Sequence, residues 1–180
     1  MGRADKPFHP GSYTIHTTGA LLFLSLVLLL VACTGRPTTE PLYAVGETAV
    51  VDGWQVTVHS FSILAGDSWR QPATDHVFCA VELTLKNTSA RIRFVMPEKQ
   101  MQMLTTANAG FAPDYEAGVM AARSHQWFVT QGQMDPGSDL HGAAAYEIPE
   151  DWQDLRWEFR SGLFPWSKRV VFALGELPAQ

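Results

Sequence analysis

Apolar and polar residues alternate with a period of two along most of the chain after residue 45. The clearest run is residues 76–87, where one face is apolar throughout, from Val77 and Cys79 to Leu85. This period is typical of strands with one buried face. Weaker or shorter versions recur along the chain, in residues 45–51, 54–63, 91–95, 101–105, 127–129, 140–148, 155–160 and 168–174.

Turn-forming residues separate these segments. Asp52-Gly53 predicts a tight hairpin, and both Asn87-Thr88-Ser89 and Pro136-Gly137-Ser138 predict turns. The alternation slips near Ser60, which indicates a β-bulge. Residues 111–126 are weakly patterned and fit either a short helix or an irregular edge. No segment shows a convincing amphipathic helix, and the spacing predicts an all-β sandwich of about seven to nine strands.

An uninterrupted apolar run near the N-terminus departs from this pattern. Residues 21–33 read LLFLSLVLLLVAC and contain no charge. A membrane-spanning helix needs roughly 20 such residues, so the shorter run is typical of the hydrophobic region of a secretory signal peptide. Arg3 and Lys6 supply a weak positive charge upstream of it.

The end of this run looks like a bacterial lipobox, made of Leu30, Val31, Ala32 and Cys33. In lipoproteins of this kind the cysteine thiol takes a diacylglyceryl group, and a peptidase then cleaves before it. The alternatives are an uncleaved anchor or an ordinary secretory signal. We therefore expect a signal peptide at 1–32, a lipidated cysteine with a flexible tether at 33–44, and one β-sandwich domain at 45–180.

Charge and cysteine content narrow the possible partners. The chain has 13 basic and 18 acidic residues; loss of the leader, with Arg3, Lys6 and Asp5, would leave 11 and 17, a net charge of −6. An acidic chain argues against a nucleic-acid partner and against electrostatic binding to anionic lipid. With Cys33 lipidated, Cys79 has no disulfide partner, and its place in an apolar face predicts an inert core thiol.

Three stretches occur in an order that resembles a known family. They are VGET with DGWQVTV in 45–58, FCAVELTLKNTS in 78–89, and DPGS, YEIPED and LRWEF in 135–159. Together they resemble the telokin-like, immunoglobulin-like domains of bacterial lipoproteins and secreted proteins, over residues 45–174. The resemblance implies the fold. It carries over no catalytic residue, because the shared motifs are turns and core strands.

Candidate binding residues lie in the loop 65–75. Trp69 and Arg70 are our preferred candidates, because loops on a rigid sandwich often carry function. The tryptophans expected in loops or at strand ends either form a patch for a protein, peptide or glycan, or cap the ends of the core. They are Trp69, Trp127, Trp152 and Trp166.

A second candidate site is a metal site. Met101 and Met103 lie two apart and would share one face of a strand, and thioethers suit Cu(I). The alternative is that both fill gaps in the core. His76, His125 and His141 have no accompanying hydrolase or metalloprotease motif, so we do not expect an enzyme.

These observations predict a lipid-anchored protein of the cell envelope, held at the cell membrane or outer membrane by Cys33. Its expected role is non-enzymatic binding or protein interaction, with no cofactor and with an unidentified envelope protein as partner. The alternative is a copper-binding lipoprotein that uses methionine and histidine ligands.

Overall fold

The computed structural model describes residues 41–64, 66, 68, 70–105, 109–123 and 128–175. The predicted leader, the lipobox and Cys33 lie outside these residues. None of the helices in the described ranges is long and apolar enough to cross a membrane.

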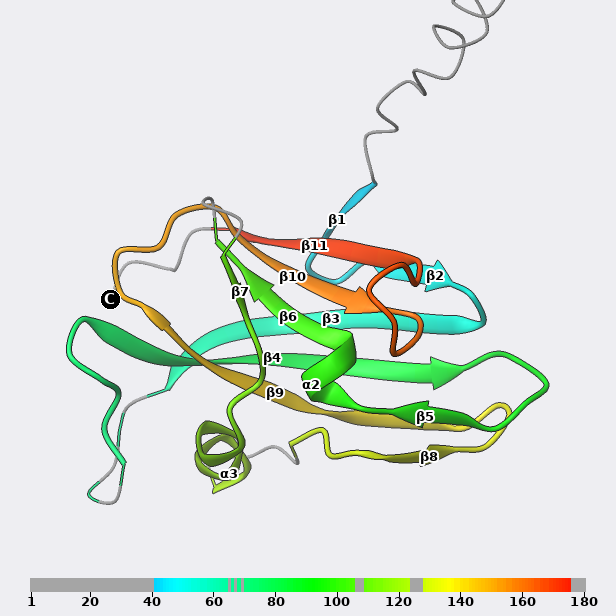
Figure 1. Ribbon diagram of the computed structural model, residues 1–180, viewed down its shortest axis with the longest axis horizontal. Helices are drawn as coiled ribbons and strands as arrows, with labels where there is room; N and C mark the ends of the chain where they lie inside the picture. Colours follow the sequence, from blue (N-terminus) through cyan, green and yellow to red (C-terminus); the bar gives the residue numbers. More distant parts are fainter. Residues whose placement is uncertain are drawn as a thin grey trace, which may run out of the picture. The chain divides into compact units, whose positions relative to one another are not determined.

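Two sheets form a β-sandwich (Figure 1). The five-stranded sheet has the order β1-β11-β10-β6-β7 and the four-stranded sheet the order β2-β3-β4-β9. The first comprises β1 (Leu42–Ala44), β11 (Arg169–Gly175), β10 (Leu155–Arg160), β6 (Met101–Leu104) and β7 (Gly110–Phe111). The second comprises β2 (Thr48–Val51), β3 (Trp54–Leu64), β4 (His76–Asn87) and β9 (Asp139–Pro149). A separate pair joins β5 (Arg93–Val95) to β8 (Gly132–Met134).

The predicted all-β sandwich is confirmed, with more strands than expected. Eleven strands lie in the described residues, because several short pairings give no alternation long enough to recognise. One of these corrects the predicted tether. Leu42–Ala44 is strand β1, which pairs in parallel with β11, and Tyr43 packs on the core with its ring centroid 5.5 Å from that of Phe172.

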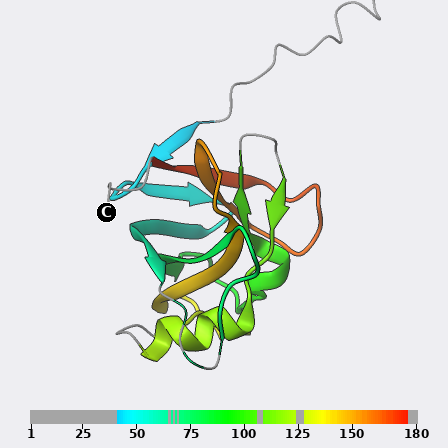
Figure 2. The same ribbon diagram turned by 90° about the vertical axis from the view of Figure 1, so that its left-hand side faces the viewer.

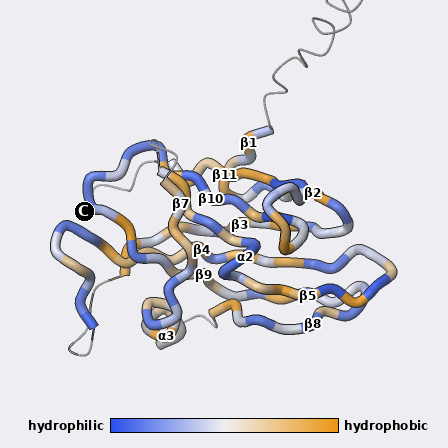
Figure 3. The backbone as a smooth tube through the Cα atoms, viewed as in Figure 1, coloured by the Kyte–Doolittle hydropathy of each residue, from blue (hydrophilic) through white to orange (hydrophobic). Residues whose placement is uncertain are grey.

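The core lies between the two sheets. The apolar face of β4 is buried as predicted, with Cys79, Val81, Leu83 and Leu85 all fully buried. The opposite sheet contributes large side chains, including Trp157, Phe159 and Phe172. Hydrophobic residues accordingly recur along the strands of both sheets (Figure 3). Burial raises the pKa of the Cys79 thiol to about 12, which supports the predicted inert thiol.

Two local predictions are also confirmed. Val51 pairs with Trp54 across Asp52-Gly53, and both turn residues have positive φ, 44° and 76°, as the tight turn requires. The register of β3 against β4 shifts between Val58 and Ser60, which is the expected bulge.

Helix α3 (Tyr115–Arg123) covers the outer face of the four-stranded sheet. It lies below the sheet in the side view (Figure 2). Small residues make most of the contact, since Ala117 and Ala121 join Ala80, Ala143 and Ala145 in a second apolar cluster, together with the larger Phe78. The segment 111–126, left open between a helix and an edge, therefore holds a helix. A shorter helix, α2 (Pro97–Gln100), precedes β6.

Candidate functional site

A pocket opens between α3, α2 and strand β9. Its volume is about 260 Å³. The floor is the alanine run of β9, where small side chains leave room that larger ones would fill. The lining residues are Pro97, Glu98, Pro113, Asp114, Tyr115, Gly118, Phe128, Val129, Thr130, Gln131, Ala143, Ala144 and Ala145.

Two aromatic rings form one wall of the pocket. Tyr115 meets Phe128 edge to face, with ring centroids 5.4 Å apart. Gly118 lets the Phe128 ring approach, because a Cβ at this position would lie 3.2 Å from Phe128 Cδ2. The segment is fixed to the sheet by a bond from the Val129 N–H to the Ala143 carbonyl, at 2.8 Å. The wall is therefore preformed.

Asp114 connects the pocket to the sheet and to the helix. Its N–H donates to the Ala145 carbonyl at 2.8 Å, and its Oδ1 accepts the Ala117 N–H at 2.8 Å. The second contact caps the start of α3, where backbone N–H groups would otherwise lack partners. Asp114 therefore sets the position at which the helix begins against β9.

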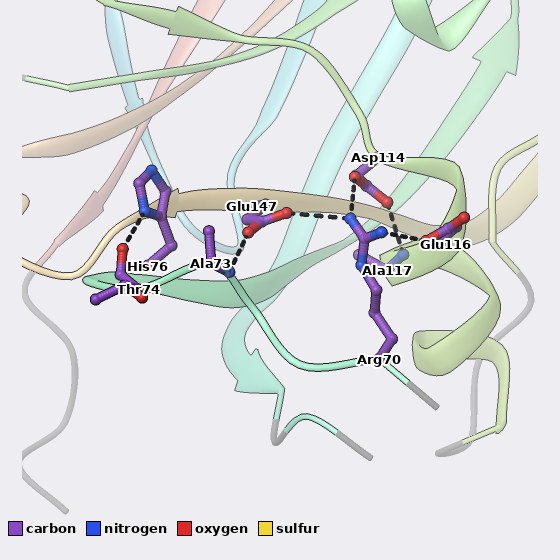
Figure 4. Close-up of polar contacts among 8 residues, drawn as sticks. All are labelled: Arg70, Ala73, Thr74, His76, Asp114, Glu116, Ala117 and Glu147. Carbon is purple, nitrogen blue, oxygen red and sulfur yellow. Dashed lines mark hydrogen bonds and ion pairs between the residues drawn. The ribbon is translucent and has the colours of Figure 1, made fainter. Parts of the chain in front are cut away.

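Arg70 gathers three carboxylates beside the pocket (Figure 4). One guanidinium nitrogen contacts Glu116, and another lies 3.2 Å from Glu147 and 3.4 Å from Asp114. The guanidinium also sits over the Phe78 ring, 5.6 Å from its centroid. Glu147 in turn accepts the Ala73 N–H at 2.6 Å. The cluster thus ties the loop before β4 to α3 and β9.

This cluster makes the site acidic. Three carboxylates against one guanidinium leave a formal charge of −2, and Glu98 adds a further negative charge at the pocket. An apolar pocket beside a cluster whose described side chains carry a net negative charge suits an apolar group that carries a neighbouring cation.

The predicted candidates have different outcomes. Arg70 lies at the site, but it is engaged with carboxylates rather than pointing freely into solvent, and Trp69 lies outside the described residues. Met101 and Met103 share a face as predicted, and both are fully buried in the main core, where they pair across the sheet with Phe159 and Trp157. Their surroundings favour core packing over copper binding.

The described histidines do not line the pocket, and His125 lies outside the described residues. His141 lies on the exposed face of β9, where its Nε2 is 3.2 Å from Glu82 and its Nδ1 is 3.0 Å from Thr84 Oγ1. His59 contacts the same threonine at 2.8 Å. Within the described residues, no group of three or more histidine, cysteine or acidic side chains is arranged to hold a metal ion.

Two of the predicted loop tryptophans are described, and they differ. Trp152 is half-buried and meets Phe61 edge to face at 5.9 Å, as expected of a residue that caps the core. Trp166 is 80 % exposed. The linear pattern does not predict the pocket. Two features of the sequence relate to it: Asp114, a typical N-cap residue, and the alanine run in β9.

The geometry defines a β-sandwich with one helix-covered face and an apolar, acid-rimmed pocket. Residues 43–171 match the family model described as "Domain of unknown function (DUF4352)", and the protein belongs to this family. Its description carries neither a telokin nor an immunoglobulin name, so the telokin-like assignment remains a resemblance. A comparison with curated proteins found no match.

Solved structures share the fold at low sequence identity. The yjhA protein of Bacillus subtilis is 12 % identical with a TM-score of 0.56, over 74 % of this chain and 99 % of that one. A functionally unknown protein of Listeria monocytogenes EGD-e is 11 % identical, TM-score 0.54, over 79 % and 89 %. The ycdA protein of Bacillus subtilis subsp. subtilis strain 168, described as a candidate lipoprotein, is 13 % identical, TM-score 0.53, over 69 % and 37 %.

Proposed function

We propose that this protein is a lipid-anchored binding module of the cell envelope, and that its pocket beside α3 receives a segment of a partner protein. The observation that carries the proposal is the apolar pocket with an acidic rim. The partner segment presents an apolar side chain to the alanine floor and a lysine or arginine to Glu98, which is exposed at the pocket, with the net negative charge of the neighbouring cluster adding attraction.

The anchor is supported by the lipobox at Leu30–Cys33. It is also supported by the shared fold with ycdA, a candidate lipoprotein. Attachment through acyl chains suits an acidic protein, which anionic lipid would repel.

The contacts of Asp114, an acidic residue that lines the pocket, favour a binding role over catalysis. A general acid or base needs a carboxyl that is available to a substrate. Asp114 lines the pocket, but one of its oxygens caps α3 and the other faces Arg70. These contacts hold the carboxylate in a structural role.

The anchor is tested by intact mass spectrometry of the protein extracted from its own membranes. A mature chain that begins at Cys33 and carries acyl mass is expected. Replacement of Cys33 with serine should leave unprocessed precursor. Normal processing of this variant, or a mature chain without lipid, would show that the anchor is wrong.

The pocket is tested by photo-crosslinking in the intact envelope. A photoreactive residue replaces Thr130, which is exposed at the pocket, and in a matched control it replaces Val50, which is 66 % exposed on β2. One recurrent envelope protein should be captured from position 130 and not from position 50. Glu98→Lys should reduce this capture by about tenfold, whereas Glu150→Lys, at an exposed position that does not line the pocket, should not. Equal capture from both positions, or equal effects of the two charge reversals, would contradict the proposal.

A further inference from the structure

The loop between β10 and β11 presents hydrophobic side chains to solvent. Leu163, Phe164 and Trp166 are 43 %, 60 % and 80 % exposed. The rings of Phe164 and Trp166 stack on each other, with centroids 4.9 Å apart and planes within 8° of parallel. These residues therefore form an apolar tip outside the core, which we call the aromatic tip.

The base of this loop is held at both ends. Asp52 accepts a hydrogen bond from Ser161 Oγ at 2.9 Å and pairs with Lys168 Nζ at 3.0 Å. The Ser161 N–H also donates to the Lys168 carbonyl at 2.8 Å, and the Trp54 indole donates to the Ser161 carbonyl at 3.0 Å. The exposure of the tip is thus a feature of a fixed loop, and little further ordering is needed for it to bind.

The aromatic tip lies at the end of the sandwich where the chain enters. Strands β1 and β11 are parallel, with Leu42 opposite Val171, so the start of β1 lies beside the start of β11, which the loop immediately precedes (Figure 1). Leu42 is itself 53 % exposed. Cys33 is nine residues before Leu42, and a chain of that length spans at most about 30 Å.

We propose that the aromatic tip inserts into the interfacial layer of the membrane that holds the acyl chains of Cys33. This inference rests on the proposed lipid anchor, and it adds a second membrane contact. Tryptophan is suited to this layer, where one side is apolar and the other wet, and phenylalanine and leucine add apolar area that can be buried there. The cations beside the tip, Lys168 and Arg169, are paired with Asp52 and Glu158, so the apolar side chains of the tip make the contact with lipid.

The position of the tether favours a lipid surface over a second copy of the chain or another protein. A short tether keeps this end of the sandwich near the bilayer at all times, so contact with lipid has a high effective concentration. The net acidic charge gives the protein no general attraction to anionic lipid, so the apolar tip supplies the contact energy. The aromatic tip shares no residue with the pocket, whose floor belongs to the other sheet.

The test uses the processed lipoprotein, purified from membranes and reconstituted into phosphatidylcholine vesicles. Bromine atoms on the lipid acyl chains quench nearby tryptophans. The fluorescence of Trp166 is obtained as the difference between the wild type and Trp166→Phe, a conservative change at an exposed site. A matched control combines Trp166→Phe with Tyr115→Trp, because Tyr115 is 71 % exposed on α3. Intact mass of the same sample records acylation.

Brominated lipid should reduce the Trp166 signal by at least about twofold and leave the tryptophan at position 115 unchanged. This quenching should persist in about 1 M salt, because apolar insertion is not screened as charge is. Absent or equal quenching with an acylated chain would overturn the membrane contact and leave the anchor intact. Loss of quenching in salt would also overturn it. So would the absence of quenching together with a dimer of the wild type that becomes monomeric in Trp166→Phe. A chain without acyl mass would overturn the anchor and this inference together.

Discussion

Replacement of Asn87 with alanine should lower the free energy of unfolding by about 3 kcal/mol. This side chain is fully buried at the end of β4. Its Nδ2 donates to the Met134 carbonyl at 2.9 Å and the Arg91 carbonyl at 2.7 Å, and its Oδ1 accepts two bonds from Ser89, at 3.0 and 2.7 Å. Asn87 thereby joins the four-stranded sheet to the β5–β8 pair.

The magnitude follows from where each partner lies. The Met134 carbonyl is the buried partner, and leaving a buried acceptor unpaired costs about 1–3 kcal/mol. The other three bonds are partly exposed, so water can replace the amide at a net cost of about 0.5 kcal/mol each. The sum is about 3 kcal/mol, which corresponds to roughly 10 °C in Tm for a domain of this size.

Urea unfolding followed by the fluorescence of the buried tryptophans measures this loss, and the dependence on urea concentration should keep its slope. Thr88→Ala is the control, because Thr88 is the exposed neighbour and its replacement should change stability by less than about 0.5 kcal/mol. A loss below about 1 kcal/mol for Asn87→Ala, or one equal to that of the control, would refute the assignment of Asn87 as a buried bridge.

Three further predictions follow. Cys79 should react with a thiol reagent at pH 8 only after unfolding, because burial raises its pKa to about 12; reaction of the folded protein would contradict this. The hydrogen bond to Lys168 lowers the pKa of Asp52 below 3.8, so this group stabilises the fold at neutral pH and ceases to do so as the pH falls through its folded pKa. Asp52→Asn should therefore be less stable than the wild type at pH 7, by a small margin that shrinks as the pH falls through the folded pKa of Asp52; urea midpoints followed from pH 7 into the acid range test this, and a constant difference would refute it. Gly118→Ala should displace the Phe128 ring, which lies 3.2 Å from the added Cβ, and weaken capture of the partner. Thermal unfolding should show stability kept or raised, because alanine favours a helix by about 1 kcal/mol; unchanged capture would show that the wall tolerates the shift.

The sequence predicts the elements whose signal is local and strong. The apolar face of β4 and the Asp52-Gly53 turn depend on neighbouring residues alone, and both are found where expected. The pattern does not decide between a helix and an edge at α3, because the buried face of this helix consists of Ala117, Gly118 and Ala121. Such small residues give little hydrophobic contrast, although they pack well on the alanines of β9.

The candidate site depends on contacts that a linear pattern does not contain. Arg70 meets carboxylates that are 44, 46 and 77 residues away in sequence. The sequence indicates the loop that contains Arg70, but the carboxylate partners of Arg70 and the pocket arise only from the fold. The spacing of Met101 and Met103 predicts that their side chains share one face of a strand, and a shared face suits a metal site. That face is the one buried in the core.

The shortness of β1 determines how the domain responds to mechanical load. Only three residue pairs join β1 to β11, and β1 is the first of the described elements that a pull from the N-terminal side reaches. Peeling β1 away would lengthen the connection by about 10 Å, at 3.3 Å per residue. The main cost within the core would be the contact between Tyr43 and Phe172. Strand β1 can therefore act as a short extensible link that yields before the rest of the sandwich is strained.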